Sequence, residues 1–464
     1  MKLKKVMVLF ISAVLVVSTF AGCTSGGNGG KSDSKDNSKG GDSKWSSWAD
    51  MFGEEYVKAR EEYEAEHDPY DIPEELVGTT VKFASFRDPE KGEDGAVIKK
   101  FEEETGIKVE YVYVPQDTYF SQLSTMIASG ESPDVYVENN EFFPSTLQIS
   151  KPLDEVESID LNDPIWDKGY IDFSTFGNHS YQVNAKNSVW QTSHLVYYNK
   201  KAFEENGIMT PQDYMDAGEW TLDNAVSIMR EFAALGEGYG GGTLKPDIIS
   251  SSLGSSIFYL KDGRFVNGLG EKGLETGYKL YHQLLDEGLS TGAQIENVMK
   301  GTVGLFTIDS FGLKANGYFK YAEPDQLGFA PLPTVEGEET YTASHYRAYG
   351  ILSGSKNTEA AGYFLRYYLD PYNYDWDSTF LSDEARDFYI EYIASEDFSN
   401  KRFNFDICGT TLLGYADYDG RYSWNQTLCW SSQSQLLTAM ESIRNEVDTA
   451  VEKANAILDE LVAK

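Results

Sequence analysis

Clusters of polar and aromatic side chains stand directly after three segments of this chain that have the pattern of buried strands. Phe86-Arg87-Asp88 follows the first segment, Glu138-Asn139-Asn140 follows the second, and Asp309 and Phe311 follow the third. Carboxylate, amide and guanidinium groups make directional hydrogen bonds, often two at a time, while an aromatic plane packs against an apolar face. Open α/β sheets bind ligands at the carboxyl ends of their strands, so we expect these clusters to meet in one ligand cleft.

No recognised reactive motif accompanies the clusters. The sequence contains no G-x-S-x-G turn, no H-E-x-x-H helix and no phosphate-binding glycine loop. Gly240-Gly241-Gly242 reads as a flexible turn, because the downstream spacing of a phosphate loop is missing. A glycosidase needs two carboxylates that flank the scissile bond, and 74 acidic residues leave that alternative open. We expect a binding protein and not an enzyme.

Length and charge restrict the number of domains and the class of partner. A chain of 464 residues is too long for one compact core, so two domains or lobes are expected. The formal net charge of -35 argues against nucleic acid, because phosphate binding needs clustered Lys and Arg. We expect no cofactor and no metal: Asp417 and Asp419 before Gly420 resemble part of a calcium loop, but most ligand positions are missing, which indicates a surface turn.

The three cysteines fit no zinc-binding spacing. Cys408 and Cys429 could be joined outside a cell, where a bridge closing a loop of this length contributes roughly 3 kcal/mol. Pairing requires their Cα atoms to lie within about 7 Å, which the sequence does not decide, so the disulfide stays open.

The N-terminus has the pattern of an export signal followed by a tether. Lysines within the first five residues precede an apolar run over residues 6–20, which has the length of a signal-peptide core and is short for a membrane span. The run ends in Phe20-Ala21-Gly22-Cys23, which resembles a bacterial lipoprotein signal. This resemblance implies that residues 1–22 are removed and that Cys23 carries a lipid. Residues 23–44 are rich in Gly and Ser and predict a flexible tether.

The body of the chain alternates strand and helix patterns. An acidic extension over residues 45–78 is expected to hold one amphipathic helix from Ser47, and we assign it no function. A regular β-α-β-α-β pattern follows, which predicts a parallel or mixed sheet covered by helices. Its expected elements are strands at Thr79–Phe86, Ile107–Val114 and Asp134–Val137, a helix at Ala96–Thr105, and a second helix that Asp117 caps and that ends at Gly130.

A second α/β unit begins near Leu195–Tyr198. Its expected elements are helices at Lys201–Asn206, Thr221–Leu235, Leu274–Glu287 and Glu359–Leu369, and strands at Val303–Ile308, Leu327–Ala330 and Tyr349–Leu352. A long helix over Ser434–Val462 carries one apolar stripe, so we expect it to dock onto a lobe.

Five passages of the chain, in order, resemble one family, the extracellular solute-binding proteins of carbohydrate importers of the ATP-binding-cassette (ABC) type. They are residues 101–109 (FEEETGIKV), 127–135 (IASGESPDV), 198–208 with the Trp220-Thr221-Leu222-Asp223 that follows, 328–333 (GFAPLP) and 350–356 (GILSGSK). The glycines in these passages end helices and Pro133 starts a strand, so the passages identify a fold and carry no reactive chemistry. The resemblance covers most of residues 79–464.

The resemblance implies an α/β, two-lobed periplasmic-binding-protein-like fold (type II) with a hinge between the lobes and a central ligand cleft. Lobe 1 would comprise residues 79–190 and 345–400, and lobe 2 residues 191–344 and 401–464. The hinge crossings are expected near Val189–Val196 and Ala343–Tyr349. Proteins of this kind close around their ligand by hinge bending.

The function implied by the resemblance is that of the substrate-binding (capture) subunit of an ABC importer. Such a subunit binds a sugar or oligosaccharide and delivers it to a membrane permease. With the lipid on Cys23, we expect a monomer anchored to the outer face of the cytoplasmic membrane.

The hinge positions and the strand ends together give the complete set of expected ligand contacts. A sugar needs aromatic planes for its C–H face and planar polar partners for its hydroxyls. The expected contacts are Phe86, Asp88, Tyr119, Glu138, Asn139, Trp190, Asp309, Phe311, Tyr346, Arg347, Trp424 and Trp430. Each also has a plain structural interpretation, as a loop carboxylate, a turn amide, a packed aromatic or an interlobe ion pair.

Two alternatives remain at this point, a secreted carbohydrate-active enzyme and a binding protein for a cationic ligand such as a polyamine. An aromatic and acidic cleft would suit the cation. The sequence names neither the sugar nor its length, linkage or affinity.

Overall fold

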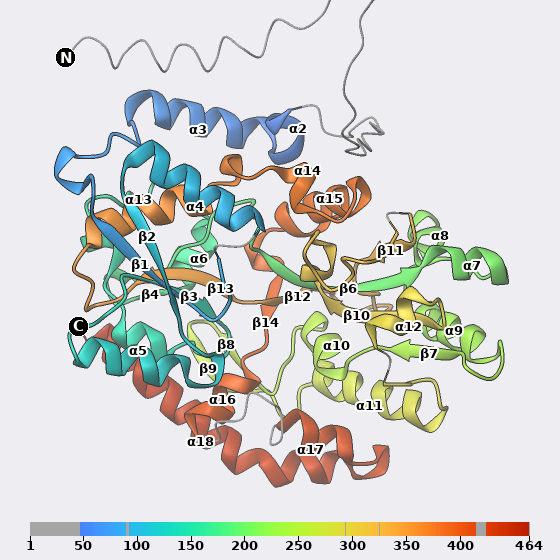
Figure 1. Cartoon of the computed structure of the whole chain (residues 1–464). Helices are drawn as coiled ribbons and strands as arrows, with labels where there is room; N and C mark the ends of the chain where they lie inside the picture. The colour runs from blue at the N-terminus through green and yellow to red at the C-terminus, as the bar shows by residue number, and fades with distance from the viewer. Residues whose placement is uncertain (1–46, 90–91, 293, 324, 414–423, 464) are drawn as a thin grey trace, which may run out of the picture. The chain divides into compact units, whose positions relative to one another are not determined.

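The computed structural model describes residues 47–89, 92–292, 294–323, 325–413 and 424–463 (Figure 1). The predicted signal peptide, Cys23 and the tether lie outside these residues, as does the predicted surface turn at Asp417–Gly420. Lipid attachment therefore stays a prediction. Within the described part of the chain, no helix combines the length and the apolar character that a membrane crossing requires.

A four-stranded sheet forms the first half of the fold, in the order β13-β3-β1-β2. Strands β1 (Thr80–Ser85), β2 (Lys108–Tyr113) and β3 (Val135–Asn139) run parallel, and β13 (Arg347–Ile351) pairs antiparallel with β3. Helices α4 (Gly92–Thr105) and α5 (Tyr119–Ala128) connect the parallel strands, which confirms the predicted β-α-β-α-β unit. Helix α13 (Thr358–Leu369) lies beside α4 (Figure 1).

The predicted cap of α5 is wrong. Asp117 lies within a short 3-10 turn over Gln116–Thr118, and Thr118 is the residue that precedes the helix. No side-chain hydrogen bond caps this helix, so a carboxylate at the expected spacing was not sufficient evidence for a cap.

A second sheet has the order β14-β12-β6-β10-β7, and β11 also pairs with β6. Its central strand β6 is buried on both faces, with Leu195 and Tyr197 in one apolar core and Val196 and Tyr198 in another. The strands are β6 (Thr192–Asn199), β7 (Gly240–Thr243), β10 (Val303–Asp309), β11 (Leu327–Ala330), β12 (Thr342–His345) and β14 (Lys401–Phe403). The main helices around them are α7 (Lys200–Asn206), α8 (Pro211–Asp216), α9 (Leu222–Ala233), α10 (Pro246–Ser252) and α11 (Lys272–Asp286).

The interpretation of Gly240-Gly241-Gly242 as a flexible turn is wrong. These residues form β7, which pairs parallel with β10 and is buried. A Cβ atom on Gly242 would lie 1.8 Å from the carbonyl oxygen of Leu305, and its φ of +119° favours glycine. Gly242 is therefore required by the close approach of the two strands and not by mobility.

The chain passes between the two sheets three times, before β6, between β12 and β13, and before β14, and the first two passages are adjacent. β12 ends at His345 and β13 begins at Arg347, so a single residue separates a strand of the second sheet from a strand of the first. The first passage enters β6 at Thr192, which pairs with His345. These two passages coincide with the expected hinge positions, while the lobe boundaries themselves stay a prediction.

The acidic extension forms two helices and not one. Helix α2 (Trp48–Phe52) ends at Gly53, whose φ is +88°, and α3 (Glu54–Glu66) begins there. A left-handed residue cannot continue a right-handed helix, which explains the break. The extension packs on the first half of the fold, where Trp48 stacks on Tyr372 with ring centroids 4.3 Å apart.

The C-terminal helix α18 (Leu436–Val462) contacts segments from both predicted lobes. It packs on β9 (Arg264–Asn267), on the 3-10 turn Ser145–Ile149 and on β4 (Thr175–Phe176). The expectation that residues 401–464 belong to lobe 2 alone is therefore too narrow. This helix of 27 residues is about 40 Å long, and its apolar stripe covers more than one neighbour.

The two body cysteines are not joined. Cys408 is buried in α16 (Asp406–Leu412), and Cys429 lies in α17 (Trp424–Trp430), where its thiol bonds to the Asn425 amide oxygen. Burial raises the pKa of both thiols.

The remaining helices and strands complete the fold. They are α6 (Lys168–Phe173), β5 (His179–Ser180), β8 (Phe258–Lys261), α12 (Ile295–Met299), α14 (Trp376–Thr379) and α15 (Asp383–Tyr389).

Candidate functional site

Two adjoining cavities, of about 340 and 120 Å³, lie between the two sheets at the ends of their strands. We call them together the cleft. Six residues line both cavities and so mark its middle: Arg87, Val189, Trp190, Phe311, Lys314 and Arg347. The first sheet supplies Arg87 and Arg347, the passage into β6 supplies Val189 and Trp190, and the turn after β10 supplies Phe311 and Lys314.

The end of β1 turns sharply into the cleft. The Ser85 hydroxyl accepts a hydrogen bond from the backbone N–H of Arg87 at 3.1 Å, which fixes this turn. The Arg87 guanidinium then lies 5.0 Å from the ring centroid of Phe311, so a side chain of the first half reaches one of the second half.

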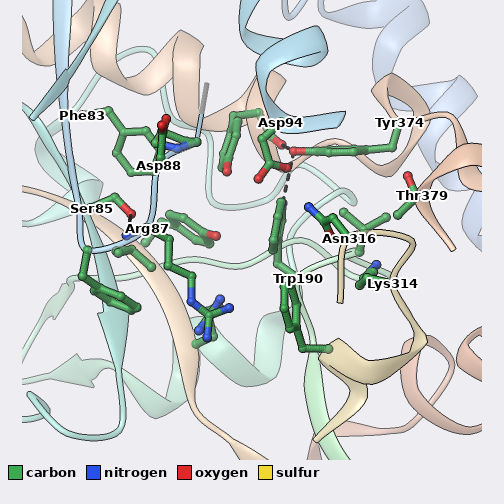
Figure 2. A pocket seen from close by; sticks show the side chains of 18 of the residues that line it. Phe83, Ser85, Arg87, Asp88, Asp94, Trp190, Lys314, Asn316, Tyr374 and Thr379 are labelled. Carbon is green, nitrogen blue, oxygen red and sulfur yellow. Dashed lines mark hydrogen bonds between the residues drawn. The ribbon is translucent and has the colours of Figure 1, made fainter. Parts of the chain in front are cut away.

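Trp190 stands in the middle of the cleft, with Arg87 and Asp88 on one side and Lys314, Asn316 and Thr379 on the other (Figure 2). Its indole N–H donates to the Tyr374 hydroxyl at 3.1 Å, and its ring is nearly parallel to that of Tyr368, at an interplanar angle of 13°. Both contacts hold the indole plane in place. A held aromatic plane beside polar groups is the arrangement expected for a sugar ring.

Lys314 is buried in the wall of the cleft. Its ammonium lies 3.9 and 4.5 Å from the ring centroids of Phe380 and Tyr389 and makes no hydrogen bond within the described part of the chain. Burial lowers the pKa of Lys314 to about 7, although the negative charge of Asp94 acts to raise it. Aromatic rings therefore face this ammonium where a carboxylate would normally pair with it.

Two further buried polar groups in the cleft lack a hydrogen-bond partner among the described residues. They are Nε of Arg347 and the amide oxygen of Asn139, whose amide nitrogen donates to Glu141. Burial raises the pKa of Glu141, while the nearby Arg347 lowers it. Buried polar groups are nearly always satisfied, so unsatisfied ones around a cavity indicate ligand contacts.

The structure brings seven of the twelve expected ligand contacts together in the cleft. They are Phe86, Asp88, Asn139, Trp190, Asp309, Phe311 and Arg347. Asp309 also has a structural role, since its carboxylate accepts hydrogen bonds from the Phe311 N–H and the Tyr318 hydroxyl. That these residues touch a ligand stays a prediction.

The other five expected contacts lie outside the cleft. Tyr119 is buried, and its hydroxyl donates a hydrogen bond to the Ala84 carbonyl. Tyr346 is also buried, and its hydroxyl donates to the side-chain oxygen of Gln182. Trp424 packs in the core beside Phe258, and Trp430 is 79% exposed at the end of α17.

Glu138 is fully buried on the face of β3 opposite to the cleft. Successive side chains of a strand point to opposite faces, so its neighbours Val137 and Asn139 line the cleft and Glu138 does not. Its carboxylate accepts hydrogen bonds from Thr146, Gln182 and the Asn139 N–H.

We expect Glu138 to make stability depend on pH. Burial raises its pKa from 4.5 to about 8, so between these values the folded chain holds a proton that the unfolded chain has released. Stability therefore falls as pH rises through this window, by at most about 1.4 kcal/mol per pH unit. In urea unfolding at pH 5, 6.5 and 8, Glu138→Gln should gain stability relative to the wild type as pH rises. Glu460→Gln, the same change at an exposed position, is the control, and equal pH slopes in all three proteins would contradict the expectation.

Several residues of the cleft were not expected from the sequence. Asp94, Lys314, Asn316, Tyr374 and Thr379 line the larger cavity, and Glu141 lines the smaller one. The position of Lys314, five residues after Asp309, was the one feature of the sequence that could have indicated its place in the cleft. Tyr374 and Thr379 follow α13, far from any strand end, and no local pattern pointed to them. Among the described residues, no group of three or more His, Cys, Asp or Glu side chains could hold a metal ion.

A family model described as bacterial extracellular solute-binding protein matches residues 84–373, which is more than half of the chain. The chain belongs to this family. A relative from Brucella abortus (strain 2308) is 27% identical over 315 residues, which make up 62% of this chain and 70% of the relative. The residues that form the cleft begin and end close to the matched range, so the family assignment covers the candidate site.

Solved structures similar to this solute-binding protein share its fold at low sequence identity. The galacto-N-biose-/lacto-N-biose I-binding protein of the ABC transporter from Bifidobacterium longum has a TM-score of 0.62 at 14% identity, over 82% of this chain and 98% of its own. The GacH receptor of Streptomyces glaucescens has a TM-score of 0.57 at 16% identity, over 83% and 99%. The predicted α/β, two-lobed binding-protein fold (type II) is therefore confirmed.

Proposed function

We propose that this protein is the capture subunit of an ABC importer and that it binds a sugar or oligosaccharide in the cleft. The observation that carries this proposal is the cleft itself, which lies between the two sheets at their strand ends. It combines the held indole plane of Trp190 with the polar groups of Asp88, Asn139 and Arg347. The Bifidobacterium longum structure was solved with lacto-N-biose and the Streptomyces glaucescens structure with acarbose, which supports a saccharide ligand.

Capture without catalysis is the mode of action that we propose. The ligand is released unchanged to the permease, so the cleft needs affinity and no reactive group. A micromolar ligand requires about -8 kcal/mol, which one or two ring stacks and several desolvated hydrogen bonds can supply. With Cys23 as the lipid attachment site, the body would act on the outer face of the cytoplasmic membrane as a monomer.

The alternative of a cationic ligand is disfavoured by the charge in the middle of the cleft. The six residues that line both cavities include three cationic side chains and no acidic one. A polyamine placed there would meet like charges, whose repulsion costs affinity.

A thermal-shift screen of mono- and oligosaccharides tests the proposal, because a ligand that binds only the folded state raises the melting temperature. Incubation of the purified protein with the same saccharides and analysis of the products tests the enzyme alternative. Saturable binding with intact saccharide is expected. Cleavage of the saccharide, or a complete lack of shift with every saccharide, would end the proposal.

A further inference from the structure

The middle of the cleft has a charge opposite to that of the chain as a whole. The chain carries 74 acidic and 39 basic residues. Yet the residues that line both cavities include Arg87, Lys314 and Arg347 and no Asp or Glu. A local excess of cations in an acidic protein attracts anions to that spot.

Each acidic residue of the cleft lines only one of its two cavities. Asp88 and Asp94 line only the larger cavity, and Glu141 and Asp309 line only the smaller one. Asp309 accepts from Phe311 and Tyr318, and Glu141 accepts from Asn139. Asp94 and Glu141 act on Lys314 and Arg347 through their charges, but no carboxylate of the described residues forms a hydrogen bond with the Lys314 ammonium.

Two of the three cations are buried, and each has a nitrogen atom without a hydrogen-bond partner. Lys314 and Arg347 are each 8% exposed, and the Lys314 ammonium and Arg347 Nε have no partner within the described part of the chain. A buried cation without hydrogen bonds is unfavourable, and an anionic partner removes much of that cost. An ordinary neutral sugar offers hydroxyl oxygens but no charge to compensate them.

We propose that the ligand of the cleft is an acidic saccharide whose carboxylate is held by Arg347 and Lys314, with its ring on Trp190. This inference rests on the proposed function and names its ligand class. A guanidinium binds a carboxylate through two parallel hydrogen bonds, and Lys314 adds a second charge from the opposite wall of the cleft. Uronic acids are sugars that carry such a carboxylate as a substituent of the ring.

Matched pairs of saccharides test the inference by calorimetry. Trigalacturonic acid is compared with galactotriose, and glucuronic acid with glucose. A sulfated galactose is included as an anionic sugar without a carboxylate. We expect the uronic acid of a pair to bind at least 30-fold more tightly than its neutral partner, and more tightly than the sulfated sugar. The preference should decrease between 50 and 500 mM salt, because screening weakens charge–charge attraction.

Substitutions then assign the preference to the proposed side chains. Arg347→Met and Lys314→Met should each reduce the preference for the uronic acid at least tenfold, and Arg347→Lys should retain part of it. Arg264→Met removes an exposed arginine outside the cleft and should leave the preference unchanged. The melting temperature of each variant is measured first. If Arg347→Met does not fold, Arg347→Lys and Lys314→Met decide the question.

The outcomes separate this inference from the proposed function. If neutral saccharides bind as tightly as their acidic partners, or if the variants keep the preference, the acidic ligand is wrong and saccharide capture stands. Preference for the sulfated sugar alone would also overturn the carboxylate assignment. If no saccharide of either kind binds, both proposals fail together.

Discussion

Trp190→Ala is expected to abolish the thermal shift that the best saccharide of the screen produces with the wild type. Trp190 and Phe311 both line the two cavities, and the indole of Trp190 is in addition held by a hydrogen bond from its N–H to the Tyr374 hydroxyl. Truncating an aromatic anchor of a binding site typically costs about 2 kcal/mol or more, which is about 30-fold in affinity. Calorimetric titration with the same saccharide gives the size of the loss.

Trp430→Ala is the matched control for this experiment. Trp430 is 79% exposed at the end of α17 and lies outside the cleft, so its removal should leave both the affinity and the melting temperature almost unchanged. The unliganded melting temperature of Trp190→Ala should fall only slightly, since Trp190 is only partly buried. An unchanged affinity in Trp190→Ala would remove this residue from the site and the ring-stacking mechanism with it.

The helices and strands could largely be predicted because most of them carry a local signal. Strand β11 (Leu327–Ala330) was expected with the observed bounds, and α9 begins after Thr221, whose hydroxyl accepts from the Asn224 N–H as an N-cap does. Two of the exceptions involve glycine. Gly53 breaks a helix, and the glycine run of β7 hides a strand, because in both cases the reason for glycine is a backbone conformation or a close contact that only the folded chain reveals.

The strand-end rule pointed to the region of the cleft but not to which residues of that region line it. Along β3, Asn139 lines the cleft and Glu138 points to the other face, and after β12 Arg347 lines the cleft while Tyr346 is buried behind it. All five residues of β3 and of β13 are buried. Because both faces of these strands are covered, the sequence shows no alternation of polar and apolar residues. Such an alternation could have shown which side chains point toward the cleft.

The cations of the cleft show a further limit of prediction from sequence. Arg87 was found because it follows a strand, but Lys314 and Thr379 come from different elements that only the tertiary fold brings to one wall. Net charge gave no indication of them, because an average of -35 carries no information about a local group of three cations. The resemblance of the sequence identified the family, and the charge of the site had to come from the structure.

The acidic extension, to which the sequence assigned no role, is expected to contribute strongly to stability through Arg60. Its guanidinium donates two hydrogen bonds of 2.6 Å to the carboxylate of Asp370, which is 1% exposed. Burial alone would raise the pKa of Asp370, but Arg60 and then Arg366 hold it below its usual value. Removing one partner of a buried ion pair typically costs about 3–5 kcal/mol, and because Arg366 still pairs with Asp370, Arg60→Met should lower the free energy of unfolding by the lower end of this range, about 3 kcal/mol. Urea unfolding at neutral pH measures this loss.

The same variant should also weaken ligand binding, because Asp370 shapes a wall of the cleft. Its carboxylate accepts from the Tyr372 N–H and so starts the turn that leads to Tyr374, the partner of Trp190. Arg264→Met is the control: this arginine pairs with Asp459 on the surface, where such pairs contribute at most about 1 kcal/mol. If Arg60→Met unfolds no more easily than Arg264→Met and binds the saccharide as the wild type does, the extension is only a covering of the fold. A loss in both measurements would instead make residues 48–66 a part that the ligand site requires.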